Sequence, residues 1–372
     1  MENGKLGELA SLFLRLGLTA FGGPAAHIAM MQREVVEQRK WLTAEEFLDL
    51  LGATNFIPGP NSTEMAIHIG RQRAGFPGLV VAGACFIVPA ALLTLGFAWA
   101  YVRFGHLPQA NAMLYGIKPV ILAVIIQALC NLGKIAVKNR WLGVLGAAAA
   151  VANALGVNEL LVLALAATLY SLRPLARGDE TRSHGMFWIF GALPPAAGIA
   201  SISPTGIFLV FLKIGSVLFG SGYVLLAFLR ADLVEHRHWL SESQLLDAVA
   251  VGQFTPGPVF STATFVGYLI RGPSGALFAT LGIFLPAFVF VMLSAPLIPK
   301  LRKSARFAQL LDGLNVASLG LMAVVTFELG RSAIVDAWTI AIALASAAIL
   351  LKTRLNSAWL VIAGGALGFV LR

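Results

Sequence analysis

The sequence predicts an all-α polytopic membrane protein, built from two inverted-topology repeats of about six helices each plus a linking helix. Among its 372 residues only 27 are basic and 18 acidic, so 12% are charged, about half of the ~25% found in an average soluble domain. Hydrophobic residues make up 58%, and the mean hydropathy is +0.81. The chain contains many apolar runs separated by short polar connectors. Each run is close in length to the roughly 20 residues that span a bilayer. This composition excludes a soluble enzyme, a disordered chain and a disulfide scaffold.

The basic excess indicates membrane topology rather than a nucleic-acid partner. The net charge is +9, and in membrane proteins Lys and Arg concentrate in cytoplasmic loops. Cys85 and Cys130 lie far apart inside apolar runs, which predicts neither a disulfide nor a metal site. We therefore expect the lipid bilayer as a partner, and no nucleic acid, metal or cofactor.

The second half of the chain repeats the first. Residues 13–60 align with residues 211–258 without a gap, and after one deleted residue Pro89 aligns with Pro286. Agreement at so many rare residue types indicates a tandem duplication. The aligned pairs include Arg15 and Lys213, Trp41 and Trp239, Asp49 and Asp247, and Pro58-Gly59-Pro60 and Pro256-Gly257-Pro258.

The repeats define three parts of the chain: a first repeat at 1–175, a linker with a linking transmembrane helix at 176–203, and a second repeat at 204–372. Each repeat contains six apolar segments. They lie near 8–31, 47–70, 78–102, 112–133, 141–156 and 158–173, and near 205–229, 245–270, 275–299, 308–329, 335–351 and 356–371.

The distribution of Lys and Arg predicts that the two repeats are inverted. If every segment spans, the side rich in Lys and Arg is the side of the N-terminus in the first repeat, which places the Trp41 loop outside. In the second repeat the rich side is that of the Trp239 loop, which must then lie inside. This reversal requires an extra crossing at 186–202. It predicts thirteen spans, with the N-terminus in the cytoplasm and the C-terminus outside. A second plan, in which the Pro-Gly-Pro segments are re-entrant hairpins, ranks lower because its charge bias is weaker.

Interrupted helices mark the candidate site. Inverted repeats with broken helices are the recurring plan of secondary transporters, and the half-helix ends hold the substrate near the membrane midplane. A half-helix that restarts after Pro60 offers free N–H groups and a positive dipole end to an anion. A simple kink in a packed helix is the alternative reading of one such motif. The predicted site residues are Phe21, Gly22, Gly23, Pro24, Asn55, Pro58, Gly59, Pro60, Asn61, Ser62, Thr63, Gly220, Ser221, Gly222, Tyr223, Gln253, Thr255, Pro256, Gly257, Pro258 and Ser261.

Charged residues near the breaks extend this site. Arg15 and Lys213 lie about two turns before the glycine breaks, inside apolar runs, so they are predicted substrate ligands or else residues that snorkel to an interface. Glu64 and His68, spaced i,i+4, face one side of a helix and are candidates for a proton-linked pair. A capping Glu and a hydrogen-bonded His is the alternative. His27 is a weaker candidate for the same proton-linked role.

The motifs FGGPAAH, WLTAEEFLDLLGATNFIPGP and WLSESQLLDAVAVGQFTPGP resemble those of the chromate ion transporter family in its long, two-domain form. The resemblance covers almost the whole chain. It implies export of chromate from the cytoplasm across the inner membrane, which confers chromate resistance, with sulfate as the related oxyanion. The second repeat departs from the family motif, because Gly220-Ser221-Gly222 replaces Gly-Gly-Pro.

We therefore expect a secondary transporter that exports a tetrahedral dianion, driven largely by the membrane potential. A carrier for sulfate or another oxyanion remains the alternative, and the sequence does not separate the two. A membrane-embedded enzyme is the alternative function outside transport. It is disfavoured because no convincing catalytic partner accompanies His106, His184, His236 and His238. The sequence is compatible with a homodimer and does not determine the oligomeric state.

Overall fold

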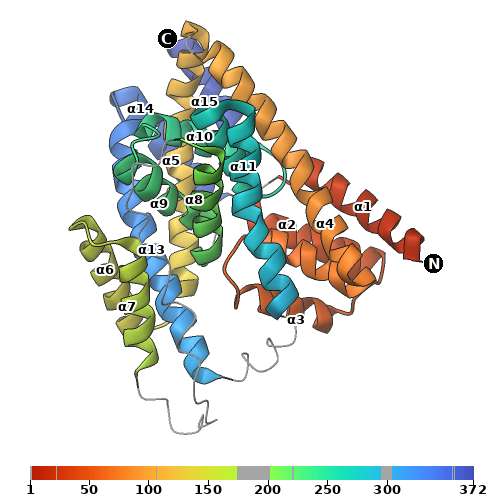
Figure 1. Cartoon of the computed structure of the whole chain (residues 1–372). Coiled ribbons are helices and arrows are strands. Elements are labelled where there is room, and N and C mark those ends of the chain that lie inside the picture. Colours follow the sequence, from red (N-terminus) through yellow and green to blue (C-terminus); the bar gives the residue numbers. More distant parts are fainter. Residues whose placement is uncertain are drawn as a thin grey trace.

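The computed structural model describes residues 2–21, 23–105, 107–173, 202–219, 222–294, 304–353, 355 and 357–372, without the side chains of Glu2, Asn3, Ala25 and Tyr223. All regular structure in these residues is helical, as predicted (Figure 1). Within the described ranges, four helices are long and apolar enough to cross a membrane, at Asn61–Phe104, Pro108–Ala136, Val259–Ser294 and Ala305–Ala333. The predicted linking helix at 186–202 lies, except for Ile202, outside the described residues.

The two repeats contain matching elements. The first comprises α1 (Glu2–Thr19), α2 (Gly23–Gln32), the π-helical turn η1 (Arg33–Gln38), α3 (Ala44–Thr54), α4 (Asn61–Phe104), α5 (Pro108–Ala136), α6 (Arg140–Ala154) and α7 (Glu159–Ser171). The second comprises α8 (Pro204–Val217), η2 (Gly222–Val224), α9 (Leu225–Leu229), the π-helical turn η3 (Arg230–His236), α10 (Glu242–Phe254), η4 (Val259–Ser261), α11 (Thr262–Ser294), α13 (Ala305–Ala333), α14 (Ala337–Lys352) and α15 (Ser357–Leu371).

Helix α4 folds back on itself at Ala74 and Gly75, where the backbone leaves the helical region and Gly75 has φ +60°. A Cβ added at Gly83 would lie 2.9 Å from Ile67, sixteen residues earlier in the chain. The arms 61–73 and 76–104 are therefore antiparallel. Helix α11 turns in the same way at Arg271 and Gly272, with φ +62° at the glycine.

Three helical hairpins accompany the long helices of the first repeat. In the first, α2 and η1 return along α1, so that Phe13 and Val35 share one buried cluster. In the second, α3 enters and the arm 61–73 returns, and Phe47 and Met65 join that same cluster. In the third, α6 and α7 pair, because Asn139 before α6 donates to the Tyr170 hydroxyl at the end of α7, at 2.8 Å.

The plan with thirteen full spans is therefore wrong, and the re-entrant plan is closer to the structure. Helices α6 and α7 have 15 and 13 residues, so at 1.5 Å per residue they reach only about 20–23 Å into a hydrocarbon core of ~30 Å. Hydropathy alone does not reveal this, because the residues of a buried hairpin are as apolar as those of a span.

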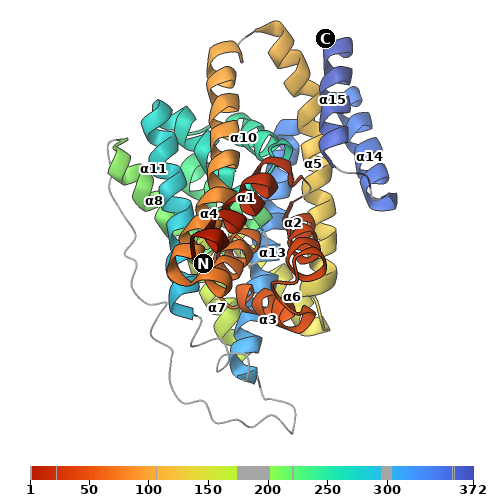
Figure 2. The same ribbon diagram turned by 90° about the vertical axis from the view of Figure 1, so that its right-hand side faces the viewer.

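The repeats run in opposite directions. We call the end of the bundle with the turn at Ala74 and Gly75 the N-face, and the end with the turn at Arg271 and Gly272 the C-face. The long arm of α4 rises in Figure 1 where α11 descends, and α5 descends where α13 rises; Figure 2 shows the same from the side. Arg71 on the N-face accordingly donates to the Val291 carbonyl near the end of α11, at 2.7 Å. The Trp41 loop lies on the N-face too, because Arg73 contacts both the Trp41 ring and Glu8 near the N-terminus. Its expected place opposite the N-terminus is therefore wrong, since α1 and α2 form a hairpin instead of one span.

Each repeat completes the other. Helix α15 of the second repeat packs on α5 of the first, where Gly116 meets Gly364 and Gly368. Helix α7 of the first packs on α13 of the second, where Gly313 meets Ala166. Small residues let helix backbones approach closely, which stabilises helix pairs within a membrane. The last hairpin of each repeat is thus held by the other repeat, and we propose that neither repeat folds alone.

The two chain termini should lie on opposite sides of the membrane. Glu8 near the start of α1 pairs with Arg73 on the N-face at 3.0 Å, whereas the last residue, Arg372, stacks on Tyr115 at the C-face at 4.4 Å. We expect a fluorescent-protein fusion and a phosphatase fusion to report opposite compartments for the two ends. Fusions that place both termini in the same compartment would contradict the inverted arrangement.

Candidate functional site

The two Pro-Gly-Pro turns reach the middle of the bundle and cross into the opposite repeat. The Gly59 N–H donates to the carbonyl of Leu218, at 2.8 Å, and the Gly257 N–H donates to the carbonyl of Ala20, at 2.9 Å. Ala20 and Leu218 are equivalent residues of the two repeats, and each ends the first helix. The predicted breaks therefore meet in pairs: the Pro-Gly-Pro turn of one repeat contacts the broken first helix of the other.

The turns need glycine. Gly59 has φ +140° and Gly257 has φ +87°, which is backbone that L residues adopt only with strain. A Cβ on Gly59 would collide with the Glu64 carboxyl, and one on Gly257 would lie 2.7 Å from the Cβ of Ala90. Gly23, at the first-helix break, has φ +77°. Positions 22, 220 and 221 of the predicted site lie outside the described residues.

The half-helices that follow the turns start without a side-chain cap. Pro60 and Pro258 occupy the cap positions and supply no capping hydrogen bond. The Thr63 N–H bonds back to the Pro60 carbonyl at 2.8 Å, and the Ser261 N–H bonds to the Pro258 carbonyl at 2.9 Å. The side-chain hydroxyls of Thr63 and Ser261 are free of any partner among the described residues.

These two hydroxyls are equivalent in the repeats and buried, at 0% and 1% exposure. A buried hydroxyl without a partner costs about 1–3 kcal/mol. Each of the two hydroxyls lies in the first turn of the half-helix that follows a Pro-Gly-Pro turn, near the positive end of its dipole. This arrangement can bind an anion through neutral donors.

The first repeat adds titratable groups that the second lacks. Glu64 is fully buried, and neither of its carboxyl oxygens has a partner among the described residues. Nε2 of the buried His68 also has no hydrogen-bond partner there. The second repeat has Thr262 at the position of Glu64, and its hydroxyl already donates to the Val259 carbonyl at 2.8 Å. His27 lies 3.0 Å from the Ala20 carbonyl, through Nε2, beside the crossing bond from Gly257.

Several predicted residues serve the turns themselves. The Thr255 hydroxyl donates to the Val251 carbonyl at 2.7 Å, and the Asn61 amide donates to Asn55 at 3.2 Å. Phe21 is 37% exposed. The others lie in or beside the turns and breaks: Pro24 in α2, Pro58, Ser62, Gly222 in η2, Gln253 and Pro256, whereas the Tyr223 side chain is outside the described residues.

Arg15 and Lys213 are not free cations at the breaks. Arg15 lies on the exposed face of α1, with 53% of its side chain exposed, and pairs with Glu34 at 2.5 Å. Lys213 pairs with both oxygens of Asp232 at 3.0 Å. Glu34 and Asp232 are themselves equivalent in the ungapped alignment. This conserved spacing of cation and carboxylate in both repeats is a signal for the ion pairs that the sequence itself carries.

Removing one partner of such a pair should lower stability rather than remove a substrate ligand. Lys213→Met leaves Asp232, whose side chain is 12% exposed, without its cation, at a cost of about 1–3 kcal/mol. We expect a lower melting temperature in detergent, restored by the second change Asp232→Asn. If the double variant is stable but no longer binds substrate, Lys213 is a ligand after all.

A second polar cluster joins the repeats and was not predicted. Asp247 in α10 is 1% exposed. It accepts a hydrogen bond from Tyr101 of α4 at 2.8 Å and lies 3.3 Å from Nζ of Lys118 of α5. The alignment of Asp49 with Asp247 was visible in the sequence, but its partners were not. The described residues hold no group of three His, Cys, Asp or Glu side chains placed to bind a metal ion.

Comparison with known proteins agrees with the repeated architecture. The family described as "Chromate transporter" matches residues 7–171 and again residues 205–369. A chromate transport protein of Cupriavidus metallidurans is 34% identical over 97% of this chain and 92% of its own length. Chromate transport proteins of Pseudomonas aeruginosa (30% identity, 98% and 92%) and Synechococcus elongatus (probable; 31%, 91% and 88%) are similar too. No solved structure matches the chain.

Proposed function

Because this chain belongs to the chromate transporter family, we propose that it is a secondary transporter that exports chromate across the cytoplasmic (inner) membrane and so confers chromate resistance. The observation that carries this proposal is the pair of crossing bonds, from Gly59 to Leu218 and from Gly257 to Ala20. They bring two uncapped half-helix starts to the centre of an inverted-repeat membrane protein, which is where secondary transporters hold their substrates.

The proposed ligands are the hydroxyls of Thr63 and Ser261 and the first free N–H groups after Pro60 and Pro258. Neutral donors suit a carrier, because they bind a dianion firmly enough to strip its water yet release it on the other side. Chromate and sulfate share charge and tetrahedral shape, so sulfate or another oxyanion is the alternative cargo. Arg15 and Lys213 contribute to stability in this proposal.

We further propose that Glu64 and His68 link a proton to the anion. A carboxylate beside a bound dianion would repel it, since like charges in a low-dielectric site interact strongly. Neither Glu64 oxygen has a donor among the described residues to stabilise its charge. The carboxyl is therefore neutral when the anion is bound, and a proton taken up with chromate would reduce the net charge that moves.

The N-face is the proposed cytoplasmic side. Its described cations outnumber those of the C-face, and positive residues mark cytoplasmic loops. The N-face has Lys5, Arg39, Lys40, Arg71, Arg73, Lys134, Lys138, Arg140 and Arg173, and the C-face has Arg103, Arg237, Arg271, Arg331 and Arg372. A dianion that leaves a negative interior gains about 4.6 kcal/mol per 100 mV. The membrane potential therefore drives export against any concentration gradient that costs less than this.

The test is flux of labelled chromate into inverted membrane vesicles under imposed potentials, with sulfate as competitor. We expect uptake that rises when the lumen is made positive and that exceeds uptake by vesicles without the protein. In the same vesicles, Glu64→Gln should remove the response to a pH gradient. Absence of chromate uptake above the empty vesicles would refute export, and competition that favours sulfate would assign sulfate as the cargo.

A further inference from the structure

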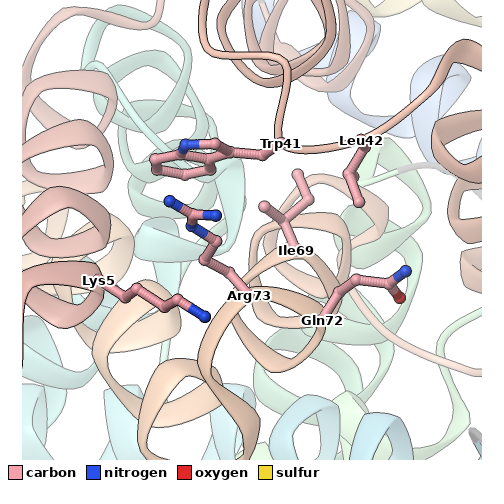
Figure 3. Close-up of a pocket in the computed structure, with 6 residues that line it drawn as sticks. All are labelled: Lys5, Trp41, Leu42, Ile69, Gln72 and Arg73. Carbon is pink, nitrogen blue, oxygen red and sulfur yellow. The ribbon is translucent and has the colours of Figure 1, made fainter. Parts of the chain in front are cut away.

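A small pocket opens on the N-face beside Trp41, at the far end of the arm 61–73 from the crossed turns. From Pro60 to Arg73 the helix runs about 20 Å at 1.5 Å per residue, so this pocket is separate from the central site. It has a volume of about 140 Å³, enough for roughly four or five waters at ~30 Å³ each. Its lining residues are Lys5, Trp41, Leu42, Ile69, Gln72 and Arg73 (Figure 3).

The pocket contains two cations and unused donors. The Arg73 guanidinium lies 4.8 Å from the centre of the Trp41 ring, and Figure 3 shows it stacked beneath the indole with Lys5 reaching toward it. Nη2 of Arg73 bonds to Glu8 at 3.0 Å, but the buried Nε has no acceptor among the described residues. Lys5 has no ion-pair partner in that part of the chain. Glu8 therefore balances the charge of Arg73, and the charge of Lys5 is not balanced by an ion pair among the described residues.

The same corner of the second repeat lacks these cations. Both repeats stack an arginine on the interfacial tryptophan: Arg39 lies 5.1 Å from the Trp41 ring, and Arg237 lies 5.1 Å from the Trp239 ring. The positions equivalent to Lys5, Gln72 and Arg73, however, are Ser203, Leu269 and Ile270. The fold therefore forms this corner without the extra cations, so stability of the hairpins does not explain them.

We propose that this pocket binds one tetrahedral oxyanion group, either the phosphate of an anionic lipid or a free oxyanion on its way to the central site. Arg73 Nε and Lys5 Nζ would each donate a charge-assisted hydrogen bond to it. The Trp41 ring and its neighbouring cations belong to the membrane–water interface, where anionic headgroups gather. The free-oxyanion source rests on the proposed function, and the lipid source does not.

The experiment measures binding by calorimetry on the full-length protein in detergent. The background carries Thr63→Val and Ser261→Ala, which removes the hydroxyls of the central site. The probes are sodium sulfate and short-chain phosphatidylglycerol, with phosphatidylcholine as the blank. Lys5→Gln should weaken binding about tenfold and Lys5→Gln with Arg73→Gln about a hundredfold, as expected for hydrogen bonds to a charged group. Arg237→Gln is the matched control and should change nothing.

The outcomes separate the sources. Binding of phosphatidylglycerol that depends on Lys5 assigns a lipid phosphate, and Lys5-dependent binding of sulfate assigns the free oxyanion. If Lys5→Gln binds both probes as tightly as the unaltered pocket does, the proposal is overturned. Arg73→Gln also breaks the link to Glu8, whereas Lys5 is exposed and unpaired in the described chain, so the single Lys5 variant keeps the test valid if the double variant is unstable. Chromate flux, measured in protein that keeps Thr63 and Ser261, tests the function of the central site independently of this pocket.

Discussion

Gly59→Leu should abolish chromate transport while the protein still inserts in the membrane. Gly59 has φ +140°, and its missing side chain leaves room for the Glu64 carboxyl. A leucine there adds backbone strain of about 1–3 kcal/mol and displaces Glu64. It also moves the N–H that bonds to the Leu218 carbonyl, which is the contact that joins the two repeats at the site. Gly257→Leu should act in the same way through Ala90 and the carbonyl of Gly17.

The control is Gly96→Leu, because a Cβ at Gly96 meets nothing within 4 Å and the new side chain faces open space. The measurement is chromate flux in inverted vesicles, normalised to the amount of transporter in the membrane. Wild-type flux in Gly59→Leu would show that the Pro-Gly-Pro turns only shape the bundle. An equal loss in Gly96→Leu would show that any enlarged glycine disturbs the protein.

Thr63→Val combined with Ser261→Ala should weaken chromate binding by about 10²–10⁴-fold, since two hydrogen bonds to a charged group are worth about 1.5–3 kcal/mol each and every 1.4 kcal/mol is tenfold. The same change should leave the melting temperature equal or higher. The reason is that both hydroxyls are buried without partners in the described chain, and removing an unsatisfied buried group relieves its desolvation cost.

A substitution that lowers chromate affinity without lowering the melting temperature identifies a substrate ligand, whereas the loss of a structural residue lowers both. Thr326→Val is the control, because the Thr326 hydroxyl already donates to the Met322 carbonyl at 2.6 Å; it should not change chromate binding. Calorimetry on purified protein measures both quantities. If the double variant binds chromate as well as wild type, the anion is held by other groups and the site must be reassigned.

Much of the candidate site could be predicted because its signals are local. Prolines that flank a glycine interrupt a helix wherever they occur, so the turns at Gly59 and Gly257 were visible in the sequence. The partner of Arg15 was only hinted at by the alignment of Glu34 with Asp232, because a cation and its carboxylate nineteen residues later become partners only if the chain turns back between them. That reversal depends on the α1–α2 hairpin, and no local pattern distinguished it from a continuous span.

The sequence by itself determined the helical membrane architecture, the duplication and the positions of the broken helices. The inverted orientation of the repeats was predicted as well, but from a count of spans that the structure contradicts, since Trp239 lies at the end of the bundle opposite to the N-terminus. The first three follow from composition, from the internal repetition and from the positions of proline and glycine, which are local properties of the chain. Only the tertiary structure decided which segments cross and which return, that α7 and α15 pack on the opposite repeat, and that Gly59 and Gly257 bond to Leu218 and Ala20. Those contacts join residues roughly 150 to 250 positions apart. Their stability depends on both segments at once, so neither segment's local pattern predicts them.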